Sequence, residues 1–463
     1  MKKTKIVCTL GPASQSIKIL TEMVKAGMNV ARLNFSHGDH TNHALLIRNI
    51  RQVSARLGIP VAIMQDLHGP KIRVHEMKEP LTVKIGQEVV IGRDFKLDAE
   101  VIRSIRPRQR ILIEDGLIEL EVKRVGGGKA YCVVLSPGKI QSRKGVNLPR
   151  TKLKIPSLSV KDIDDLKFGL KQDVDFVAIS FVRSKTDVVK LKKLIGKYNP
   201  KNLLPPKIIA KIEKPEAVKN FDGILKEADG IMVARGDLGV EMPESQVPII
   251  QKTIIQKCLK ASKPVIVATQ MLDSMIRNPR PTRAEVSDVA NAVIDQTDCV
   301  MLSGETAFGR YPVKAVQQMA KIIEVTEKSV FLPTRRHLLD KAISKTEAVA
   351  ESVSELSDQT KARVVVGATD SGFTAREIAH ERPNVASIVM LTPQPKVLRQ
   401  MCLLWGVSGY LVPRVDTYEK LLKLMIDTVK KRHLASRGER VVIVTGEPLG
   451  LKENLNLVEI KTV

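Results

Sequence analysis

Eight short apolar runs recur along the chain, and their spacing restricts the possible folds more than any other feature. The runs are rich in β-branched residues and almost continuously apolar, which is typical of parallel strands covered on both faces. Most successive runs begin 23 to 35 residues apart, the length of one strand plus one crossover helix. Eight such units predict a closed (β/α)₈ TIM barrel. The runs are 5–10, 28–35, 61–66, 175–181, 207–213, 230–236, 264–270 and 299–305.

One interval breaks this rhythm, because more than a hundred residues separate Asp66 from Asp175. Residues 81–91 and 110–123 alternate in part between apolar and polar, and Asp-Gly, Gly-Gly-Gly and Pro-Gly turn signals follow. The interval therefore predicts a small antiparallel β-barrel domain inserted after the third strand. Such an insertion lies above the face that carries active sites in these barrels, where a lid is useful.

The last part of the chain repeats the strand and helix pattern in a third region. A helical stretch is followed by five strand candidates, at 363–369, 386–391, 407–412, 440–445 and 455–461, which predict an open α/β sheet. The loop 369–374 follows the first of these strands and precedes a helix, where free N–H groups favour a phosphate, although a structural turn explains it equally well. We expect four segments: barrel 1–70, lid 71–156, barrel 157–336 and an α/β domain 337–463 for regulation or oligomerisation.

Composition excludes several classes of protein. No apolar stretch is long enough to span a membrane or to serve as a secretory signal, so we expect a cytoplasmic protein without a membrane partner. The five cysteines are scattered and predict reduced thiols. The net charge of +25 attracts polyanions, but aromatic residues are only 3% of the chain and the basic runs are short, which argues against nucleic-acid binding. His37, His40 and His43 are spaced as a metal site might be, but a polar loop leading into a helix is the simpler interpretation.

Polar residues at the ends of the predicted barrel strands are the candidates for function. Lys211 and Glu213 point to one face of their strand. An exposed strand could carry such charges for solubility, but residues 208–210 before them are apolar, and a charged pair on a buried strand is costly without partners, which favours a functional role. Glu213 and Asp237 follow neighbouring strands, and two carboxylates together with a phosphate make a good Mg²⁺ site. Arg32, Arg73 and Lys161 are suited to clamp phosphoryl oxygens. The sequence contains neither a GxxxxGK[ST] loop nor the HRD and DFG motifs of protein kinases.

Seven motifs together closely resemble the pyruvate kinase family, and they follow one another in order through the whole predicted barrel. The resemblance implies the same three-part architecture that the strand pattern predicts. It also implies Mg²⁺-dependent transfer of a phosphoryl group from phosphoenolpyruvate to ADP, giving pyruvate and ATP in glycolysis. The motifs are 5–14 (KIVCTLGPAS), 31–38 (ARLNFSHG), 211–213 (KIE), 232–239 (MVARGDLG), 268–272 (ATQML), 281–292 (PTRAEVSDVANA) and 301–306 (MLSGET).

The resemblance assigns a role to each matching position. It implies that Lys211 stabilises charge on the phosphoryl group and the enolate, that Glu213 and Asp237 hold Mg²⁺, and that Thr269 belongs to the polar chain near the carbon that is protonated. The identity of the proton donor stays open. The remaining implied contacts are with substrate (Arg32, Ala234, Arg235, Gly236, Thr269) and with nucleotide (Asn34, His37, Arg73, Lys161).

One departure from the family pattern concerns a monovalent cation. Members that need K⁺ hold it with the residues that match Asn34, Ser36 and Asp66 and the carbonyl of Leu67, and they carry Glu where this chain has Lys71. An ammonium group supplies the same single positive charge. We therefore expect that K⁺ is not required; the alternative is that Lys71 merely faces solvent at the hinge of the lid.

The remaining expectations concern regulation, assembly and rival functions. Asp370 stands where sugar-bisphosphate-activated members often have Lys, so we expect a monophosphate effector at Thr369, Ser371 and Thr374, or none. The family is usually tetrameric, which implies a homotetramer. Two rivals are a Mg²⁺-dependent lyase or aldolase, which would lack the lid, and a polyanion-binding protein with an inactive barrel, which would lack the charged strand-end residues.

Overall fold

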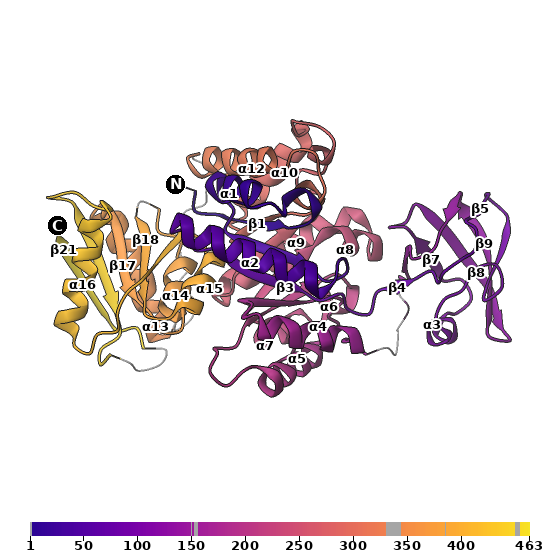
Figure 1. Cartoon of the computed structure of the whole chain (residues 1–463), viewed down its shortest axis with the longest axis horizontal. Helices are drawn as coiled ribbons and strands as arrows, with labels where there is room; N and C mark the ends of the chain where they lie inside the picture. The colour runs from indigo at the N-terminus through magenta and orange to yellow at the C-terminus, as the bar shows by residue number, and fades with distance from the viewer. Residues whose placement is uncertain (1, 150, 152–155, 330–343, 385, 450–453) are drawn as a thin grey trace.

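Three regions follow one another along the longest axis of the molecule (Figure 1). A computed structural model describes residues 2–149, 151, 156–329, 344–384, 386–449 and 454–463. The inserted domain lies at one end, the barrel in the middle and the C-terminal domain at the other end. The boundary expected at 336/337 lies outside the described residues, and the exact limits of the four segments stay a prediction.

The eight predicted runs form the eight parallel strands of one closed barrel, as expected. Around it the strand order is β1, β16, β15, β14, β13, β12, β3, β2. The strands are β1 (Lys5–Thr9), β2 (Val30–Asn34), β3 (Ala62–Asp66), β12 (Phe176–Ile179), β13 (Lys207–Ile212), β14 (Gly230–Ala234), β15 (Val265–Ala268) and β16 (Cys299–Leu302).

Several strands end earlier than their apolar runs predict, and the backbone gives the reason. Phe181 has a φ of 53°, and Thr269 and Gln270 have φ values of 70° and 53°, so none of them continues an extended strand. After β14 the chain turns at once into helix α8 (Arg235–Glu241). Arg235, Gly236 and Thr269 therefore stand just beyond the strands, on turns over the barrel mouth, whereas Arg32, Asp66 and Lys211 lie at the ends of the strands themselves.

Helices cover the outside of the barrel, and their starts follow recognisable signals. Thr282 and Glu285 form the expected capping box of α10, and Pro215 opens α6. The other barrel elements are η1 (Pro12–Ser14), α1 (Ile17–Ala26), α2 (His40–Leu57), α4 (Val160–Lys171), α5 (Lys185–Tyr198), α6 (Pro215–Lys219), α7 (Phe221–Glu227), η2 (Glu244–Gln246), α9 (Val247–Lys260), η3 (Asp273–Ile276), α10 (Arg283–Ile294), α11 (Gly304–Ala307) and α12 (Pro312–Glu327).

The inserted domain is antiparallel, as predicted, and wraps around its own apolar core as a half-barrel. It has a six-stranded sheet in the order β4, β11, β7, β8, β9, β6 and a two-stranded ribbon of β10 and β5. Helix α3 (Ala99–Ser104) was not expected from the sequence. The strands are β4 (Ile72–Arg73), β5 (Leu81–Val83), β6 (Glu88–Ile91), β7 (Arg110–Ile113), β8 (Ile118–Gly126), β9 (Lys129–Ser136), β10 (Gly138–Ile140) and β11 (Gly145–Asn147).

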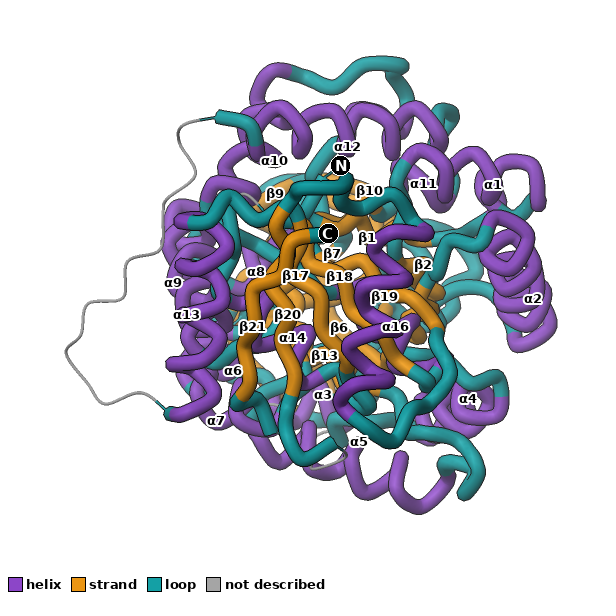
Figure 2. The backbone as a smooth tube through the Cα atoms, turned by 90° about the vertical axis from the view of Figure 1, so that its left-hand side faces the viewer, coloured by secondary structure: helices purple, strands orange, loops and turns teal. Residues whose placement is uncertain are grey.

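The C-terminal domain has the expected five-stranded sheet, which faces the viewer in Figure 2. Its order is β19, β18, β17, β20, β21, and only β21 runs antiparallel. Helices α13 and α14 pack on one face of the sheet and α16 on the other. The elements are α13 (Lys345–Gln359), β17 (Val364–Ala368), α14 (Phe373–His380), β18 (Ser387–Thr392), α15 (Pro395–Gln400), η4 (Met401–Leu403), β19 (Val407–Leu411), α16 (Tyr418–Lys431), β20 (Arg440–Thr445) and β21 (Leu457–Thr462).

The C-terminal domain closes the amino-terminal mouth of the barrel. Leu403 is fully buried among the side chains that fill the barrel interior. The Lys5 Nζ, at the start of β1, donates to the carbonyl of Val407 at 2.7 Å. Arg399 pairs with Asp175 at 2.7 Å, and Asp175 also accepts from a backbone N–H of β3. The two domains therefore share one core and a set of buried ion pairs.

Candidate active site

The opposite, carboxyl-terminal mouth of the barrel faces the inserted domain (Figure 1). The predicted polar residues gather at this mouth. At its centre, the Lys211 Nζ lies 2.9 Å from Glu213 Oε1 and 3.3 Å from Asp66 Oδ2, and donates to Ser180 Oγ at 2.8 Å. The Arg32 Nη2 is 2.7 Å from Asp66 Oδ2. Two cations and two carboxylates from three strands, β2, β3 and β13, thus form one buried cluster.

Mutual electrostatics set the charge of this cluster. Burial by itself would lower the pKa of Lys211, but the carboxylates of Asp66 and Glu213 outweigh burial and raise that pKa. Burial opposes ionisation of Asp66, yet Lys211 and Arg32 lower the pKa of its carboxyl group. Burial raises the pKa of Glu213, and Lys211 offsets that rise only in part. Lys211 is therefore a permanently charged ammonium at the bottom of the mouth.

The donor set of Glu213 and Asp237 fits a divalent cation. Glu213 Oε2 accepts from the N–H of Phe181 at 2.6 Å, and Oε1 lies 2.9 Å from the Lys211 ammonium. Asp237, in the first turn of α8, pairs only loosely with Lys71 at 3.4 Å. In the described part of the chain no group of three His, Cys, Asp or Glu side chains converges as a metal cage. These two carboxylates suit Mg²⁺ that takes its other ligands from substrate and water.

A strained turn beside this pair positions the residues of the predicted substrate pocket. Thr269, with its positive φ, accepts from the N–H of Gly236 on Oγ1 at 2.7 Å. The Arg235 guanidinium donates to the carbonyl of Thr269 at 2.7 Å and pairs with Asp288 at 2.7 Å. Ala234, Arg235, Gly236 and Thr269 therefore lie together, as predicted. The role of Asp288 in holding Arg235 was not expected, although its place within the 281–292 motif was a signal.

The four predicted monovalent-cation positions also come together, but their polar atoms have protein partners. Asn34 Oδ1 accepts from the N–H of Ser36 at 3.1 Å, and Ser36 Oγ lies 2.7 Å from His68 Nδ1. Ser180 Oγ donates to the carbonyl of Leu67 at 2.9 Å. Burial, and then Arg73, lower the pKa of His68 to about 4, so this imidazole is neutral. Among the described contacts, the ammonium of Lys71 pairs with Asp237 rather than with these four residues.

The predicted nucleotide contacts line one rim of the mouth. Lys161, on α4, donates to the carbonyl of Phe35 at 3.0 Å and to Asp165 at 2.6 Å. Arg73 donates to the carbonyl of Arg143 at 2.9 Å. Burial, and then Arg73, lower the pKa of His37. The rim is therefore basic, which suits the phosphates of a nucleotide.

The three closely spaced histidines do not converge on a metal. His43 is buried and stacks on Phe35, with ring centroids 4.0 Å apart. His40 pairs with Asp165 at 2.7 Å and stacks on Phe168. The interpretation as a polar loop leading into a helix holds, because α2 begins at His40 with Asp39 as its N-cap.

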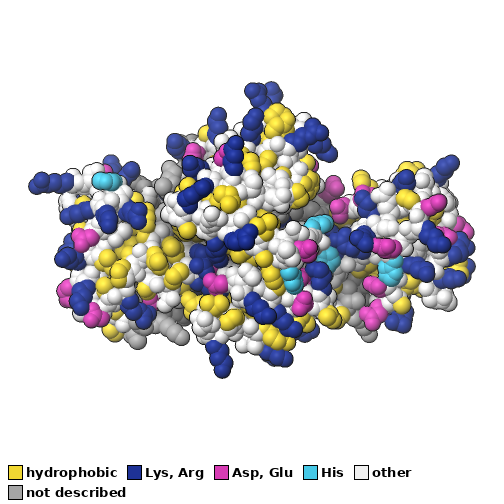
Figure 3. Space-filling model, in the orientation of Figure 1, with side chains coloured by type: hydrophobic (Ala, Val, Ile, Leu, Met, Phe, Trp, Pro, Cys, Tyr) yellow, Lys and Arg dark blue, Asp and Glu magenta, His cyan; other side chains and the backbone are white. Residues whose placement is uncertain are grey.

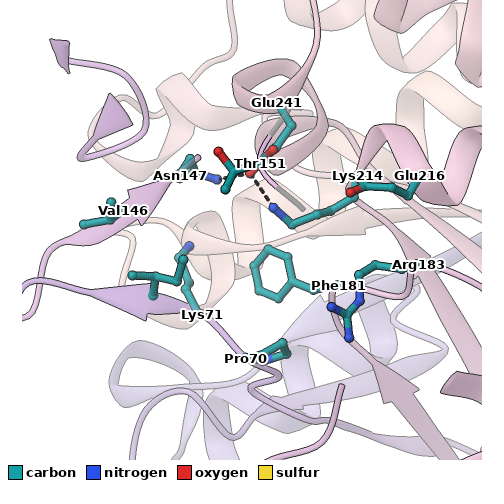
Figure 4. A pocket seen from close by; sticks show the side chains of 11 residues that line it. Pro70, Lys71, Val146, Asn147, Thr151, Phe181, Arg183, Lys214, Glu216 and Glu241 are labelled. Carbon is teal, nitrogen blue, oxygen red and sulfur yellow. Dashed lines mark hydrogen bonds and ion pairs between the residues drawn. The ribbon is translucent and has the colours of Figure 1, made fainter. Parts of the chain in front are cut away.

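A narrow cleft lies between the barrel and the inserted domain (Figure 4). Asn147 of β11 and Lys214 both bond the buried carboxylate of Glu241 there. None of these three residues was expected from the sequence. A signal existed, because Lys214 follows Glu213 directly and Glu241 lies one helical turn after Asp237.

The candidate effector loop is partly occupied by its own contacts. Thr369 Oγ1 accepts from the N–H of Gly372 at 2.9 Å, and Asp370 pairs with Arg414 at 2.6 Å. Gly372, with a φ of 83°, is the N-cap of α14. An effector at this loop stays a prediction.

Two general findings bear on the kind of partner. The described part of the chain has no helix that is both long and apolar enough to cross a membrane. Lys and Arg side chains are spread over all three regions of the visible face, interspersed with acidic ones (Figure 3). This spread is typical of a solvated basic surface.

Comparisons with known proteins agree with this geometry. A family model described as the barrel domain of pyruvate kinase matches residues 1–316, and one described as its alpha/beta domain matches residues 347–461. A pyruvate kinase of Geobacillus stearothermophilus is 44% identical, with 100% of this chain and 80% of that protein covered. One of Clostridium acetobutylicum is 39% identical, with both chains fully covered. A crystal structure of a pyruvate kinase from Cryptosporidium parvum superposes with a TM-score of 0.91 at 37% identity, covering 100% of this chain and 96% of that one.

Proposed function

The chain belongs to the pyruvate kinase family and is a phosphotransferase, and on this premise we propose that it transfers the phosphoryl group of phosphoenolpyruvate to ADP with Mg²⁺ as cofactor. The products are pyruvate and ATP. The observation that carries the proposal is the Lys211 cluster: a charged ammonium 2.9 Å from Oε1 of a buried carboxylate, Glu213, with a second carboxylate, Asp237, just beyond the neighbouring strand. An inactive barrel or a lyase without a lid is not compatible with the family matches and the inserted domain.

In this proposal Lys211 is the main electrostatic catalyst. Its ammonium is fixed by Ser180, Asp66 and Glu213, so it needs no reorganisation when negative charge develops on the transferring phosphoryl group and the enolate. Arg32 adds a second fixed positive charge from the neighbouring strand. Because both cations are held by Asp66, their geometry is set before substrate binds.

Glu213 and Asp237 are the residues that would hold the metal, and Mg²⁺ bound there would neutralise the carboxylate and phosphate oxygens of the substrate. The N–H of Phe181 orients the Glu213 carboxylate so that Oε1 faces the Lys211 ammonium. Asp237 is oriented by its place in the first turn of α8.

The turn at Ala234, Arg235 and Gly236 forms the floor beneath the substrate carboxylate. Thr269 fixes this floor through the N–H of Gly236, and Arg235 is held by Asp288. Thr269 Oγ1 donates to the carbonyl of Ala268 at 2.5 Å, so its proton is shared within the turn. We place Thr269 in the polar chain near the protonated carbon and leave the final proton donor unassigned.

The basic rim of Asn34, His37, Arg73 and Lys161 is our candidate for the nucleotide phosphates. An ion pair with Asp165, one turn later on α4, holds the ammonium of Lys161 in place. With the inserted domain above it, the rim excludes water, which would otherwise hydrolyse the phosphoryl group.

We further propose that K⁺ is not required. Two features support this proposal. The ammonium of Lys71 places a positive charge 3.4 Å from Asp237, and the Ser36 hydroxyl already shares a hydrogen bond with His68. An effector at residues 369–374, a homotetramer and a cytoplasmic location complete the proposal as expectations from the family resemblance.

The decisive experiment measures pyruvate release from phosphoenolpyruvate and ADP with Mg²⁺, first without K⁺ and then with K⁺ added. Full activity without K⁺ supports both proposals. Activity that appears only with K⁺ keeps the kinase and refutes the role of Lys71, as does a Lys71→Glu variant whose activity is unchanged in both Na⁺ and K⁺ buffers. Failure to form pyruvate in either buffer contradicts the kinase proposal.

A further inference from the structure

One carboxylate, Glu241, joins the inserted domain to the barrel beside the active site (Figure 4). Its Oε1 accepts from Asn147 Nδ2 at 3.0 Å and from Lys214 Nζ at 2.7 Å. The Glu241 side chain is 1% exposed and that of Lys214 is 14% exposed. A dry carboxylate with two donors is a strong and specific contact, because water does not compete for it.

The three bonded residues come from three segments that matter for the reaction. Asn147 ends β11, the strand by which the inserted domain returns to the barrel. Lys214 directly follows Glu213, and its ammonium also lies over the ring of Phe181, whose N–H holds Glu213. Glu241 ends the same short helix, α8, that carries Asp237 in its first turn. The contact therefore links the inserted domain to the two segments that carry the candidate metal ligands, Glu213 and Asp237.

A second and looser contact joins the other hinge strand to the same helix. Lys71 precedes β4, which pairs with β11, and its ammonium lies 3.4 Å from Asp237. Both side chains are 23% exposed. A Cβ on Gly145 would come within 3.0 Å of the Lys71 Cε, so the lysine chain lies against the opposite hinge strand. The Lys71 contact is wet and exchangeable, whereas the Glu241 contact is dry.

We propose that Glu241 is a positioning residue that fixes the inserted domain and the Glu213 segment to helix α8. Through Asn147 it holds the inserted domain over the barrel mouth. Through Lys214 it fixes the position of Glu213 relative to Asp237. Where it concerns Glu213 and Asp237 as metal ligands, this inference rests on the proposed function. The effect on the inserted domain does not.

The test uses the full chain and three variants: Glu241→Ala, Asn147→Ala and Lys214→Met. Glu244→Ala, an exposed glutamate three residues beyond Glu241, is the matched control. The first readout is the rate at which a protease cuts the connections to the inserted domain under native conditions. We expect Glu241→Ala and Asn147→Ala to raise this rate about tenfold, since each frees the return strand, and Lys214→Met to raise it less.

The second readout is equilibrium binding of Mn²⁺ alone, without substrate. We expect Glu241→Ala and Lys214→Met to weaken Mn²⁺ about tenfold, whereas Asn147→Ala leaves it within twofold of the unmodified chain. Glu241→Gln, which keeps an acceptor for Asn147, should restore protease resistance but not Mn²⁺ affinity. This separation of the two readouts is what a merely structural role would not produce.

The outcomes are distinguishable. If Glu241→Ala matches Glu244→Ala in both readouts, the proposal is wrong; if Glu241→Ala does not fold, Asn147→Ala and Lys214→Met decide in the same way. Equal effects of Asn147→Ala and Lys214→Met on both readouts would also overturn it. A chain that forms no pyruvate but shows the expected protease pattern refutes the proposed function and leaves the attachment role supported.

Discussion

The two mouths of the barrel bury charge in opposite ways. At the amino-terminal mouth, Asp175 is satisfied by Arg399 and by a backbone N–H, and the fully buried Leu403 fills the interior. At the carboxyl-terminal mouth, Lys211 faces two carboxylates and lies 2.9 Å from Glu213 Oε1. The charges of the first mouth are paired with the C-terminal domain, whereas those of the second converge on the opening that faces the inserted domain. Burial of charge alone therefore does not mark a site; convergence of the buried charges on an opening does.

The largest expected difference between the mouths comes from exchanging one buried lysine at each. Lys211→Met should lower kcat about 10³-fold, since a fixed charge is lost from the reacting centre. Lys5→Met, at the other mouth, should leave kcat within twofold. Steady-state pyruvate formation by both variants measures this. Comparable losses of activity in the two variants would show that the mouths are not functionally distinct.

The reverse asymmetry is expected for stability. Arg399→Leu removes one of the two arginine partners of the fully buried Asp175, the other being Arg51, and should lower the free energy of unfolding by about 2 kcal/mol. Its kcat should change by less than twofold. Urea unfolding of this variant and of Arg437→Leu, an exposed control, measures the difference. A large loss of activity without a loss of stability would contradict the assignment of this mouth as structural.

A smaller effect should appear in the pH dependence of stability. Burial, and then Lys5, lower the pKa of Lys2 to about 7. Between pH 7 and the ordinary lysine pKa the unfolded chain holds a proton that the folded chain has lost, so stability rises with pH in this window. Because the side chain is partly exposed, we expect a gain of about 1–2 kcal/mol from pH 7 to 10 that Lys2→Met abolishes.

Urea midpoints at the two pH values, with the exposed Lys18→Met as control, test this expectation. An identical pH profile for Lys2→Met and the unmodified chain would mean that Lys2 is not desolvated at this mouth.

The smallest effect returns to the active site. Asp288 is 35% exposed, so its pair with Arg235 is partly screened. Asp288→Asn should raise the KM for phosphoenolpyruvate about two- to fivefold and leave the melting temperature nearly unchanged. A change in kcat alone would instead place Asp288 in the chemical step and not in the support of the substrate floor.

Local sequence patterns predicted the fold well for physical reasons. Each barrel strand is a continuous apolar run, and α10 begins at a Thr-x-x-Glu box, so periodicity and capping chemistry suffice. The strand ends were harder, because the positive φ values of Phe181 and Thr269 come from tertiary packing at the mouth and not from residue preference.

The sequence placed the candidate active-site residues by strand ends and family motifs, but it could not supply their partners. Asn147, Lys214 and Glu241 lie on three separate segments, and only folding brings them together. The contact of Lys71 with Asp237 was likewise not predictable, since it depends on how the Lys71 side chain lies against Gly145 of β11. The short helix α3 gave too weak a periodic signal to be recognised.

Closure of the barrel mouth by the C-terminal domain has a consequence for biosynthesis. β1 pairs with β16, Lys5 opposite Cys299, and the interior is filled by Leu403. At translation rates of about 5–20 residues per second, the first strand waits roughly 20 to 80 s for its last neighbours to emerge from the ribosome. During that interval its apolar face is exposed, and a chaperone that shields nascent chains would act on the amino-terminal half. The nascent chain is thus least protected before its C-terminal domain has been synthesised.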